Sequence, residues 1–400
     1  MTRPGLAASP ATTVTNPATA VSGPTKRLLS LDIVRGITIA FMIMVNNNGG
    51  AGSWGFMNHA LWNGLTPTDL VFPTFVFVVG VSVVFAFEAR LAKGAAKGQL
   101  ARHTTIRAGV LVAFGIIVNS FPFFHVAHMR FYGVLQRIAV CYLVVGLFYL
   151  YDKRAWTKVA ALAGALMGYW ILVRWVPVPG LGLPGHDIPF MDMNRNMVSW
   201  IDQHVFPHHL YLYRPDFNTR DPEGLLSDLP AIGTALLGVL TGIWLRTARV
   251  AREKFAGLAV GAVACLLFGY LWAQWFPLNK NMWTSSFVLV AGGYSLTLLT
   301  LCYWAVEVRG WRKGWTYVWV VFGSNAIGAY MFSELAPSIF WLVQVHEGTR
   351  AVTLQEWLMQ HFYEAFLPVG WAQFGWSVSI AAFCFIPVWI LYRKKIFLKV

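Results

Sequence analysis

The sequence predicts an all-α fold, a polytopic membrane helix bundle with about ten transmembrane helices. Hydrophobic residues make up 57% of the 400 positions and charged residues only 12%, well below the roughly 25% of an ordinary soluble domain. The apolar residues lie in blocks of about 20, enough for a helix to cross a hydrocarbon core of roughly 30 Å. We therefore expect a multi-pass protein of the inner (cytoplasmic) membrane.

Ten apolar blocks give the expected helices in chain order. Each is a nearly uninterrupted apolar run, and polar or basic segments separate most of them. The expected spans are residues 28–47, 69–89, 106–121, 131–151, 156–175, 224–245, 255–276, 284–306, 316–343 and 371–392. Residues 176–223 form a long aromatic segment of mixed charge between two of these spans, and its length predicts a folded cap over a site on the outer side.

The distribution of Lys and Arg predicts an N-in/C-in orientation. Of the 31 basic residues, 22 lie in the N-terminal segment, in four alternate connections and in the C-terminal segment. Basic residues gather on the cytoplasmic side of membrane proteins, so we place both termini and residues 90–107 inside and residues 176–223 outside. The net charge of +14 is then a topology signal. Because the basic residues are dispersed between helices, no nucleic-acid partner is expected.

Two further features bound the domain organisation. Residues 1–26 are rich in Ala, Thr and Pro and have no apolar core of signal-peptide length, which predicts a disordered cytoplasmic tail before a transmembrane domain at 27–400. The four cysteines fall within expected helices without metal-type spacing, so we expect packing roles and no metal. The sequence leaves a homodimer open.

Ionisable and amide side chains inside the expected spans are costly in lipid and usually face a partner or a cavity. Asp32 and Arg35 are three residues apart and are expected to pair on one helical face. Gln136 and Arg137 lie just below the outer end of the fourth span, where the guanidinium needs an anion or backbone carbonyls. Asn325 lies within the ninth span, and a hydrogen bond between helices is the simpler explanation for it.

The loop between the first two spans contains a candidate catalytic group. Its single histidine, His59, suits proton transfer near neutral pH or nucleophilic catalysis. An amide such as that of Asn46 can donate to a developing oxyanion. Asp69 can hold an imidazole in one tautomer, although it could equally cap the second helix.

Six blocks of the sequence resemble the heparan-α-glucosaminide N-acetyltransferase family, in the order in which that family has them. These blocks are "RLLSLDIVRGITIAFMIMVNNNGG", "HALWNGLTPTDLVFPTFVFVVGVS", "GVLQRIAVCY", "DPEGLLSDLPAIGTALLGVLTG", "PLNKNMWTSSFVLV" and "FGSNAIGAYMFSE". The resemblance runs from about residue 27 to residue 395. It implies a polytopic enzyme that moves an acetyl group from cytosolic acetyl-CoA to the amino group of a glucosamine unit across the membrane.

The resemblance also implies roles for particular residues. The family's active-site histidine matches His59, and its companion asparagine matches Asn46 best within a run of three asparagines. We expect Asp69 to assist His59. The remaining expected contacts are with acetyl-CoA (Gln136, Arg137, Asn325 and Arg35) and with the amino-sugar acceptor (Asn47, Trp62, Asn63 and Glu334). Two alternatives stay open at this point: an O-acyltransferase of a periplasmic polysaccharide, and a transporter of a sugar or lipid headgroup.

Overall fold

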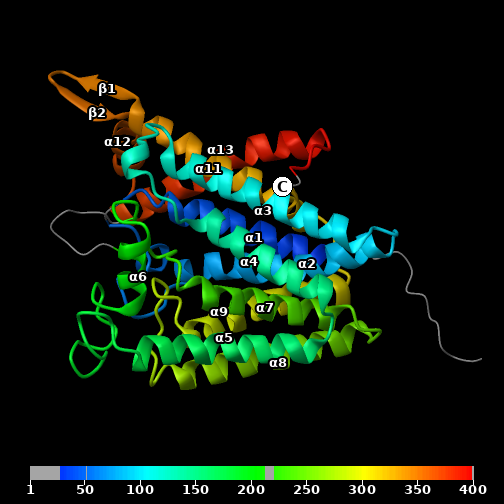
Figure 1. Ribbon diagram of the computed structural model, residues 1–400. Coiled ribbons are helices and arrows are strands. Elements are labelled where there is room, and N and C mark those ends of the chain that lie inside the picture. Colours follow the sequence, from blue (N-terminus) through cyan, green and yellow to red (C-terminus); the bar gives the residue numbers. More distant parts are fainter. Residues whose placement is uncertain (1–27, 51, 212–219, 399–400) are drawn as a thin grey trace, which may run out of the picture.

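The structure, a computed structural model, describes residues 28–50, 52–211 and 220–398 (Figure 1). The predicted disordered tail at residues 1–26 lies outside the described residues. Within the described part of the chain, nine helices are long and apolar enough to cross a membrane. They are α1 (Leu29–Asn46), α2 (Val71–Leu91, preceded by the 3-10 turn Pro67–Leu70), α3 (Lys97–Ser120), α4 (Val134–Tyr151), α5 (Ala155–Trp175), α7 (Asp228–Leu245), α8 (Ala251–Trp272), α9 (Ser285–Tyr303) and α13 (Val369–Arg393).

The span expected at 316–343 is the one that the structure divides. Two shorter helices, α10 (Thr316–Ser324) and α11 (Ala326–Leu342), meet at Asn325, whose φ of −130° and ψ of 42° are not helical. The Asn325 side chain binds the backbone near the C-terminus: Nδ2 donates to Ile396 O at 3.1 Å, and Oδ1 accepts from Leu398 N at 2.9 Å. The hydrogen bond expected of Asn325 is therefore made to another chain segment, and it interrupts the helix.

Shorter elements gather at one end of the bundle. They are α6 (Met197–Val205), β1 (Gln344–Glu347), β2 (Arg350–Thr353), α12 (Leu354–Leu358), the π-helical turn Met359–Glu364, and the 3-10 turns Gly55–Met57 and Val126–His128. A second π-helical turn, Trp304–Val308, extends α9. In Figure 1, α6 and the β1–β2 hairpin lie at the same end, beyond the long helices. The expected outer segment 176–223 thus includes one helix, α6, within its described part.

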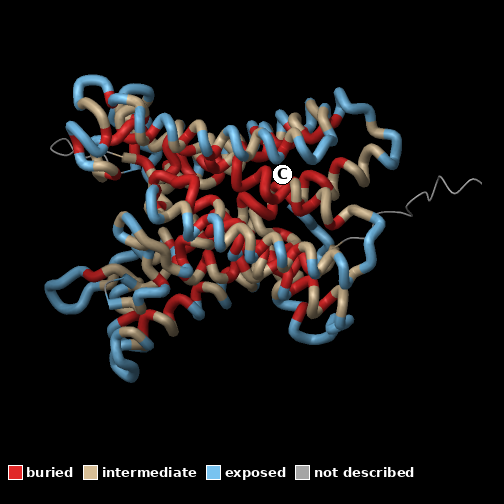
Figure 2. Tube along the Cα trace, turned by 90° about the horizontal axis from the view of Figure 1, so that it is seen from below, coloured by how far each residue is buried: buried red, intermediate tan, exposed pale blue. Residues whose placement is uncertain are grey.

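The long helices form an interior group and a rim. About two-thirds or more of the apolar window is buried in α1, α2, α7 and α9, against 17% in α8 and 22% in α3. Figure 2 shows the buried residues along the middle of the molecule and the exposed ones on its outer faces and loops. A helix that is apolar all round yet mostly uncovered, such as α8, suits contact with lipid.

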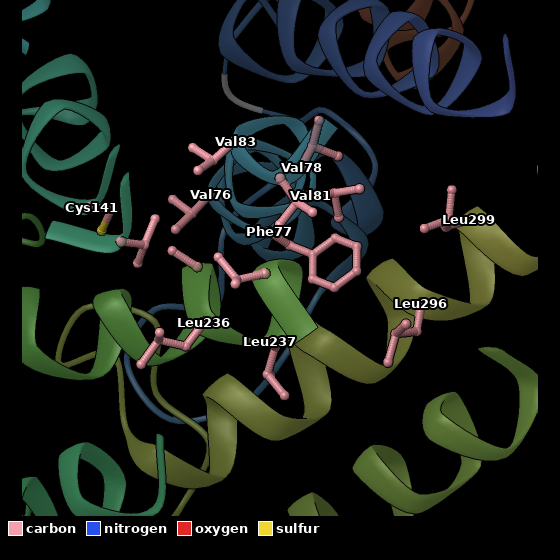
Figure 3. Close-up of a cluster of buried hydrophobic side chains, with 14 of the residues drawn as sticks. Val76, Phe77, Val78, Val81, Val83, Cys141, Leu236, Leu237, Leu296 and Leu299 are labelled. Carbon is pink, nitrogen blue, oxygen red and sulfur yellow. The ribbon is translucent and has the colours of Figure 1, made fainter. Parts of the chain in front are cut away.

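Close packing of α2 against α7 forms the centre of the apolar core. Residues of α2, α4, α7 and α9 converge there, among them Phe77, Leu236 and Leu296 (Figure 3). Two glycines let the backbones of α2 and α7 approach: a Cβ on Gly80 would lie 2.0 Å from Ala235 O, and one on Gly238 would lie 2.0 Å from Phe77 O. Small residues at such crossings are the usual means of tight helix association in membranes.

Candidate functional site

His59 and Asp69 form a paired acid and base at the start of α2. His59 Nδ1 lies 2.7 Å from Asp69 Oδ1, and because a carboxylate only accepts, Nδ1 carries the proton and Nε2 keeps a free lone pair. The other carboxylate oxygen accepts from the backbone nitrogens of Ala60 and Thr66, at 3.1 and 3.0 Å. Asp69 therefore does both things that the sequence left open: it caps the turn before α2 and orients the imidazole.

The half-exposed His59 ring faces a cavity of about 380 Å³, which we name the His59 cavity. Its wall comes from α1, from the loop before α2, from the segment before α7 and from the loop between α8 and α9. Polar lining residues are Asn46, His59, Thr68, Asp69, Arg130, Tyr211, Arg220, Glu223, Lys280 and Asn281. The site is thus assembled from segments far apart in the sequence.

Asn46 is the one residue of the asparagine run that lines this cavity. Its Nδ2 donates to Glu334 Oε1 at 2.8 Å, which leaves a second N–H on the same amide. Asn47 instead donates to Ile43 O at 2.9 Å, and Asn48 donates to Asn58 Oδ1 at 2.9 Å. The structure therefore favours Asn46 over its neighbours as a group that can reach a ligand beside His59.

Lys280 is a site residue that the sequence interpretation did not single out, since it was counted only as an outer basic residue. Its Nζ lies 3.2 Å from each ring nitrogen of His59. Burial lowers the pKa of Lys280, and the carboxylates of Glu223 and Asp69 act in the opposite direction. The block "PLNKNMWTSSFVLV" was a signal for this residue, because the lysine stands among polar residues between two apolar spans.

An ion cluster forms another part of the wall of the His59 cavity. Arg130 binds Asp221, with Nε 2.8 Å from Oδ2, and also binds Glu223. Burial opposes ionisation of Glu223, but Arg130 and Arg137 outweigh it and lower the pKa of that carboxyl. Arg220 lies over the Trp62 ring, 4.9 Å from its centroid, and burial lowers its pKa.

A second cavity of about 330 Å³ lies between α1, α2, α3, α4, α10 and α11, and we name it the Arg35 cavity. Its polar and charged lining includes Arg35, Arg90, His103 and Arg107. Arg35 pairs with Asp32 at 3.3 Å, as the sequence predicted, and donates to Ser82 Oγ at 2.8 Å. Arg90 lies at the end of α2, and His103 and Arg107 lie in the first half of α3.

Met42 and Val134 line both cavities. Met42 belongs to α1 and Val134 begins α4, so these two side chains stand where the Arg35 cavity and the His59 cavity adjoin. Their apolar side chains present no charge to a group that passes between the two cavities.

Three of the residues expected at acetyl-CoA line neither cavity. Asn325 holds the C-terminal segment, and Gln136 is buried with no hydrogen-bond partner for its amide among the described residues. Arg137 is 1% exposed and is fully engaged: Nε donates to Asp228 Oδ1 at 2.9 Å and Nη2 to Gly224 O at 3.0 Å. The anion and the carbonyls expected around this guanidinium are supplied by the protein itself. These contacts are typical of a structural residue.

The residues expected at the acceptor also line neither cavity, but three of them support the site. Trp62 Nε1 donates to Met191 O at 2.8 Å, which ties the His59 loop to the 176–223 segment. Asn63 Oδ1 accepts from Asn279 Nδ2 at 3.1 Å, in the loop that carries Lys280. Glu334 orients Asn46. These side chains position residues that line the cavity. Among the described residues, no group of three or more His, Cys, Asp or Glu side chains is arranged to hold a metal ion.

Comparison with known proteins places this arrangement in a family. Residues 27–269 match the family model described as "Heparan-alpha-glucosaminide N-acetyltransferase, catalytic". The chain is 28% identical to heparan-alpha-glucosaminide N-acetyltransferase of Homo sapiens and 27% identical to that of Mus musculus, with 94% of this chain and 60% of each relative covered. The chain thus spans about 60% of the length of these curated relatives. Since the family model covers more than half of the chain, including His59, Asn46 and Asp69, the chain belongs to the heparan-α-glucosaminide N-acetyltransferase family.

Proposed function

We propose that the protein is a transmembrane acetyltransferase. It moves the acetyl group of cytosolic acetyl-CoA to the amino group of a glucosamine-type sugar on the outer side of the membrane. The observation that carries this proposal is the pair of cavities that adjoin at Met42 and Val134, one with a basic lining and one with a histidine and aspartate pair.

The Arg35 cavity suits the donor. CoA carries several negative charges and cannot cross a bilayer, whereas the thioester-bound acetyl group is small and neutral. Arg90, His103 and Arg107 would hold the phosphates at the basic part of the cavity, and its apolar part would take the pantetheine arm. Of the four residues expected at acetyl-CoA, Arg35 is the one whose place agrees with this role.

His59 would supply the proton transfer or the nucleophile. In direct transfer, Nε2 takes a proton from the sugar amine as the nitrogen adds to the thioester carbonyl, and the departing CoA thiolate takes up that proton. In the two-step route, Nε2 itself adds to the carbonyl and expels the thiolate, and the amine then removes the acetyl group from the ring. Asp69 favours the required tautomer in both routes.

The orientation belongs to this proposal too. The His59 cavity and residues 176–223 would lie outside, and the Arg35 cavity would open toward the cytoplasm. A cysteine placed at Lys97, in an otherwise fully active protein, should resist an impermeant reagent added to sealed cells. Its modification from outside would refute the orientation.

The decisive experiment is turnover of acetyl-CoA by the purified protein with a panel of amino sugars and hydroxylated sugars. We expect acetylation of glucosamine-type acceptors at nitrogen. The His59→Ala variant should bind acetyl-CoA normally and lose roughly 10² to 10⁴ in rate, and Asn46→Ala should lose about 10² if its amide stabilises the oxyanion. A His59→Ala protein with the wild-type rate would remove the central assignment.

Labelled acetyl-CoA without acceptor separates the two routes. Label on the wild-type protein and none on His59→Ala indicates an acetyl-histidine, whereas label on neither indicates direct transfer. Acetylation of the hydroxylated sugars alone would replace the proposal with the O-acyltransferase alternative, and movement of sugar without acetylation would favour the transporter.

A further inference from the structure

Lys280 occupies an unusual place beside His59. Its Nζ is 3.2 Å from Nδ1 and 3.2 Å from Nε2, and a position equidistant from both nitrogens is not in line with the lone pair of either. The ammonium therefore lies alongside the ring and leaves the in-plane direction of Nε2 open to the cavity. Any carbonyl that reacts at Nε2 brings its oxygen within reach of the ammonium.

The loop that carries Lys280 is held rigidly. Asn279 is fully buried, and its Oδ1 accepts from Met282 N at 2.8 Å. Leu278 O accepts from Gly64 N at 2.8 Å, which joins this loop to the His59 loop. Trp283 is buried with a φ of +52°, a conformation that costs free energy in a residue with a side chain. Strain held by dense packing beside a reactive side chain indicates a position fixed for function.

We propose that Lys280 is a catalytic residue of the transfer, and that its ammonium binds the carbonyl oxygen of the acetyl group. This inference rests on the proposed acetyl transfer at His59 and adds a residue to it. Asn46 was the expected oxyanion donor, but one of its two N–H groups is engaged by Glu334. A lysine at hydrogen-bond distance from Nε2 supplies a full positive charge at the same centre.

In the proposed reaction Lys280 neither gains nor loses a proton. When the nitrogen nucleophile adds to the acetyl carbonyl carbon, the π electrons move onto oxygen, and Lys280 donates a hydrogen bond to the resulting oxyanion. Collapse restores the C=O bond and breaks the C–S bond. In direct transfer the CoA thiolate takes the proton that the sugar amine releases. In the two-step route the thiolate leaves without that proton, and Nε2 takes it from the amine when the acetyl group departs from the ring. Lys280 ends the cycle as the same ammonium with which it began.

Burial lowers the pKa of Lys280 below its ordinary value, while the carboxylates of Glu223 and Asp69 face it and favour the charged form. The proposed role belongs to the ammonium form. A cationic lysine is also protected from acetylation, because only a neutral amine attacks an acyl group.

Two substitutions test the proposal in steady-state kinetics with acetyl-CoA and the best amino sugar. Lys280→Met should lower kcat by roughly 10² to 10³, as expected for loss of an oxyanion donor, while acetyl-CoA affinity measured by titration stays within a few-fold of wild type. Lys280→Arg should restore part of the rate. Lys313→Met removes a lysine from an exposed loop and should leave the kinetics unchanged.

The pH profile distinguishes catalysis from a structural role. The wild-type rate should fall on the alkaline side as Lys280 loses its proton, and the Lys280→Arg variant should keep its rate to higher pH, because a guanidinium stays protonated. An active wild-type protein whose Lys280→Met variant keeps at least half of kcat would overturn the inference. An alkaline limb identical in Lys280→Arg and wild type would do the same. A wild-type protein inactive with every acceptor would instead remove the proposed function itself.

Discussion

Asp202, in α6, is expected to make the protein less stable as the pH rises toward neutrality. Its side chain is fully buried, Oδ1 accepts from Leu225 N at 2.9 Å, and Oδ2 has no hydrogen-bond partner among the described residues. Burial raises the pKa of Asp202 to about 7, and the neighbouring Asp221 adds to the effect. The backbone N–H of Leu225 and the charge of Arg137 act against it but do not cancel it.

The sign follows from where the proton binds. A folded-state pKa above the ordinary value means that the folded protein holds a proton that the unfolded chain releases, so stability falls between about pH 4 and pH 7 and stays lower above. A pKa of about 7 in place of 3.8 corresponds to about 4 kcal/mol in the free energy of unfolding. Asp202→Asn keeps the acceptor for Leu225 N and cannot ionise, so it should recover much of the lost free energy of unfolding at pH 8.

The assay is thermal unfolding of the detergent-solubilised protein between pH 5 and pH 8. The unfolding temperature of Asp202→Asn minus that of wild type should be smaller at pH 5, where only part of the loss has occurred, and should increase by several degrees by pH 8. Asp192→Asn provides the contrast, because hydrogen bonds from Asn194 N and Arg195 N stabilise the Asp192 carboxylate and that variant should lose stability at pH 8. The reasoning would be refuted if the difference in unfolding temperature between Asp202→Asn and wild type stayed constant or decreased as the pH rises.

Three further predictions follow from the packing and the cavities. Arg137→Met should cost about 3 to 5 kcal/mol because it strands a buried carboxylate, and adding Asp228→Asn should recover part of the loss in an unfolding assay. Gly238→Ala should destabilise by about 1 to 3 kcal/mol because its Cβ would meet Phe77 O at 2.0 Å, whereas Gly168→Ala, which meets nothing within 4 Å, should be neutral or slightly stabilising. Arg35→Met should weaken acetyl-CoA binding about tenfold or more, as measured by titration, because a charged donor is lost from the cavity wall.

Hydropathy was enough to predict where nine of the expected spans lie. In lipid a helix must make all of its backbone hydrogen bonds within itself, so each span is a long apolar run that is visible in the sequence. The break at Asn325 could not be read in this way. The run from 316 to 343 is predominantly apolar, and the side chain at its break, Asn325, is held by residues 396–398, a tertiary contact that the run itself does not reveal. The orientation and the ten-span count are still predictions.

The sequence predicted those residues of the candidate site that have suitable chemistry and also lie near one another in the chain. His59, Asp69 and Asn46 lie close together in the sequence, and the structure brings the first two into contact and places Asn46 in the same cavity. Lys280 comes from a loop more than 200 residues away, so no local pattern connects it to His59. The interpretation of Arg137 was limited in the same way, because its partners lie in the segment before α7 and at the first residue of α7, Asp228, far from its own span.

Met42 and Val134, which line both cavities, affect how readily ions can leak across the membrane through the protein. Under the proposed orientation the two cavities enter the bundle from opposite sides of the membrane, and the membrane's electric field then falls mainly across the region between them, where Met42 and Val134 line both. Moving one elementary charge through such a barrier involves about 2.3 kcal/mol per 100 mV. An acetyl group is uncharged and does no electrical work in passing, whereas protons and other ions do. The same thin apolar barrier can therefore pass an acyl group and still insulate the membrane.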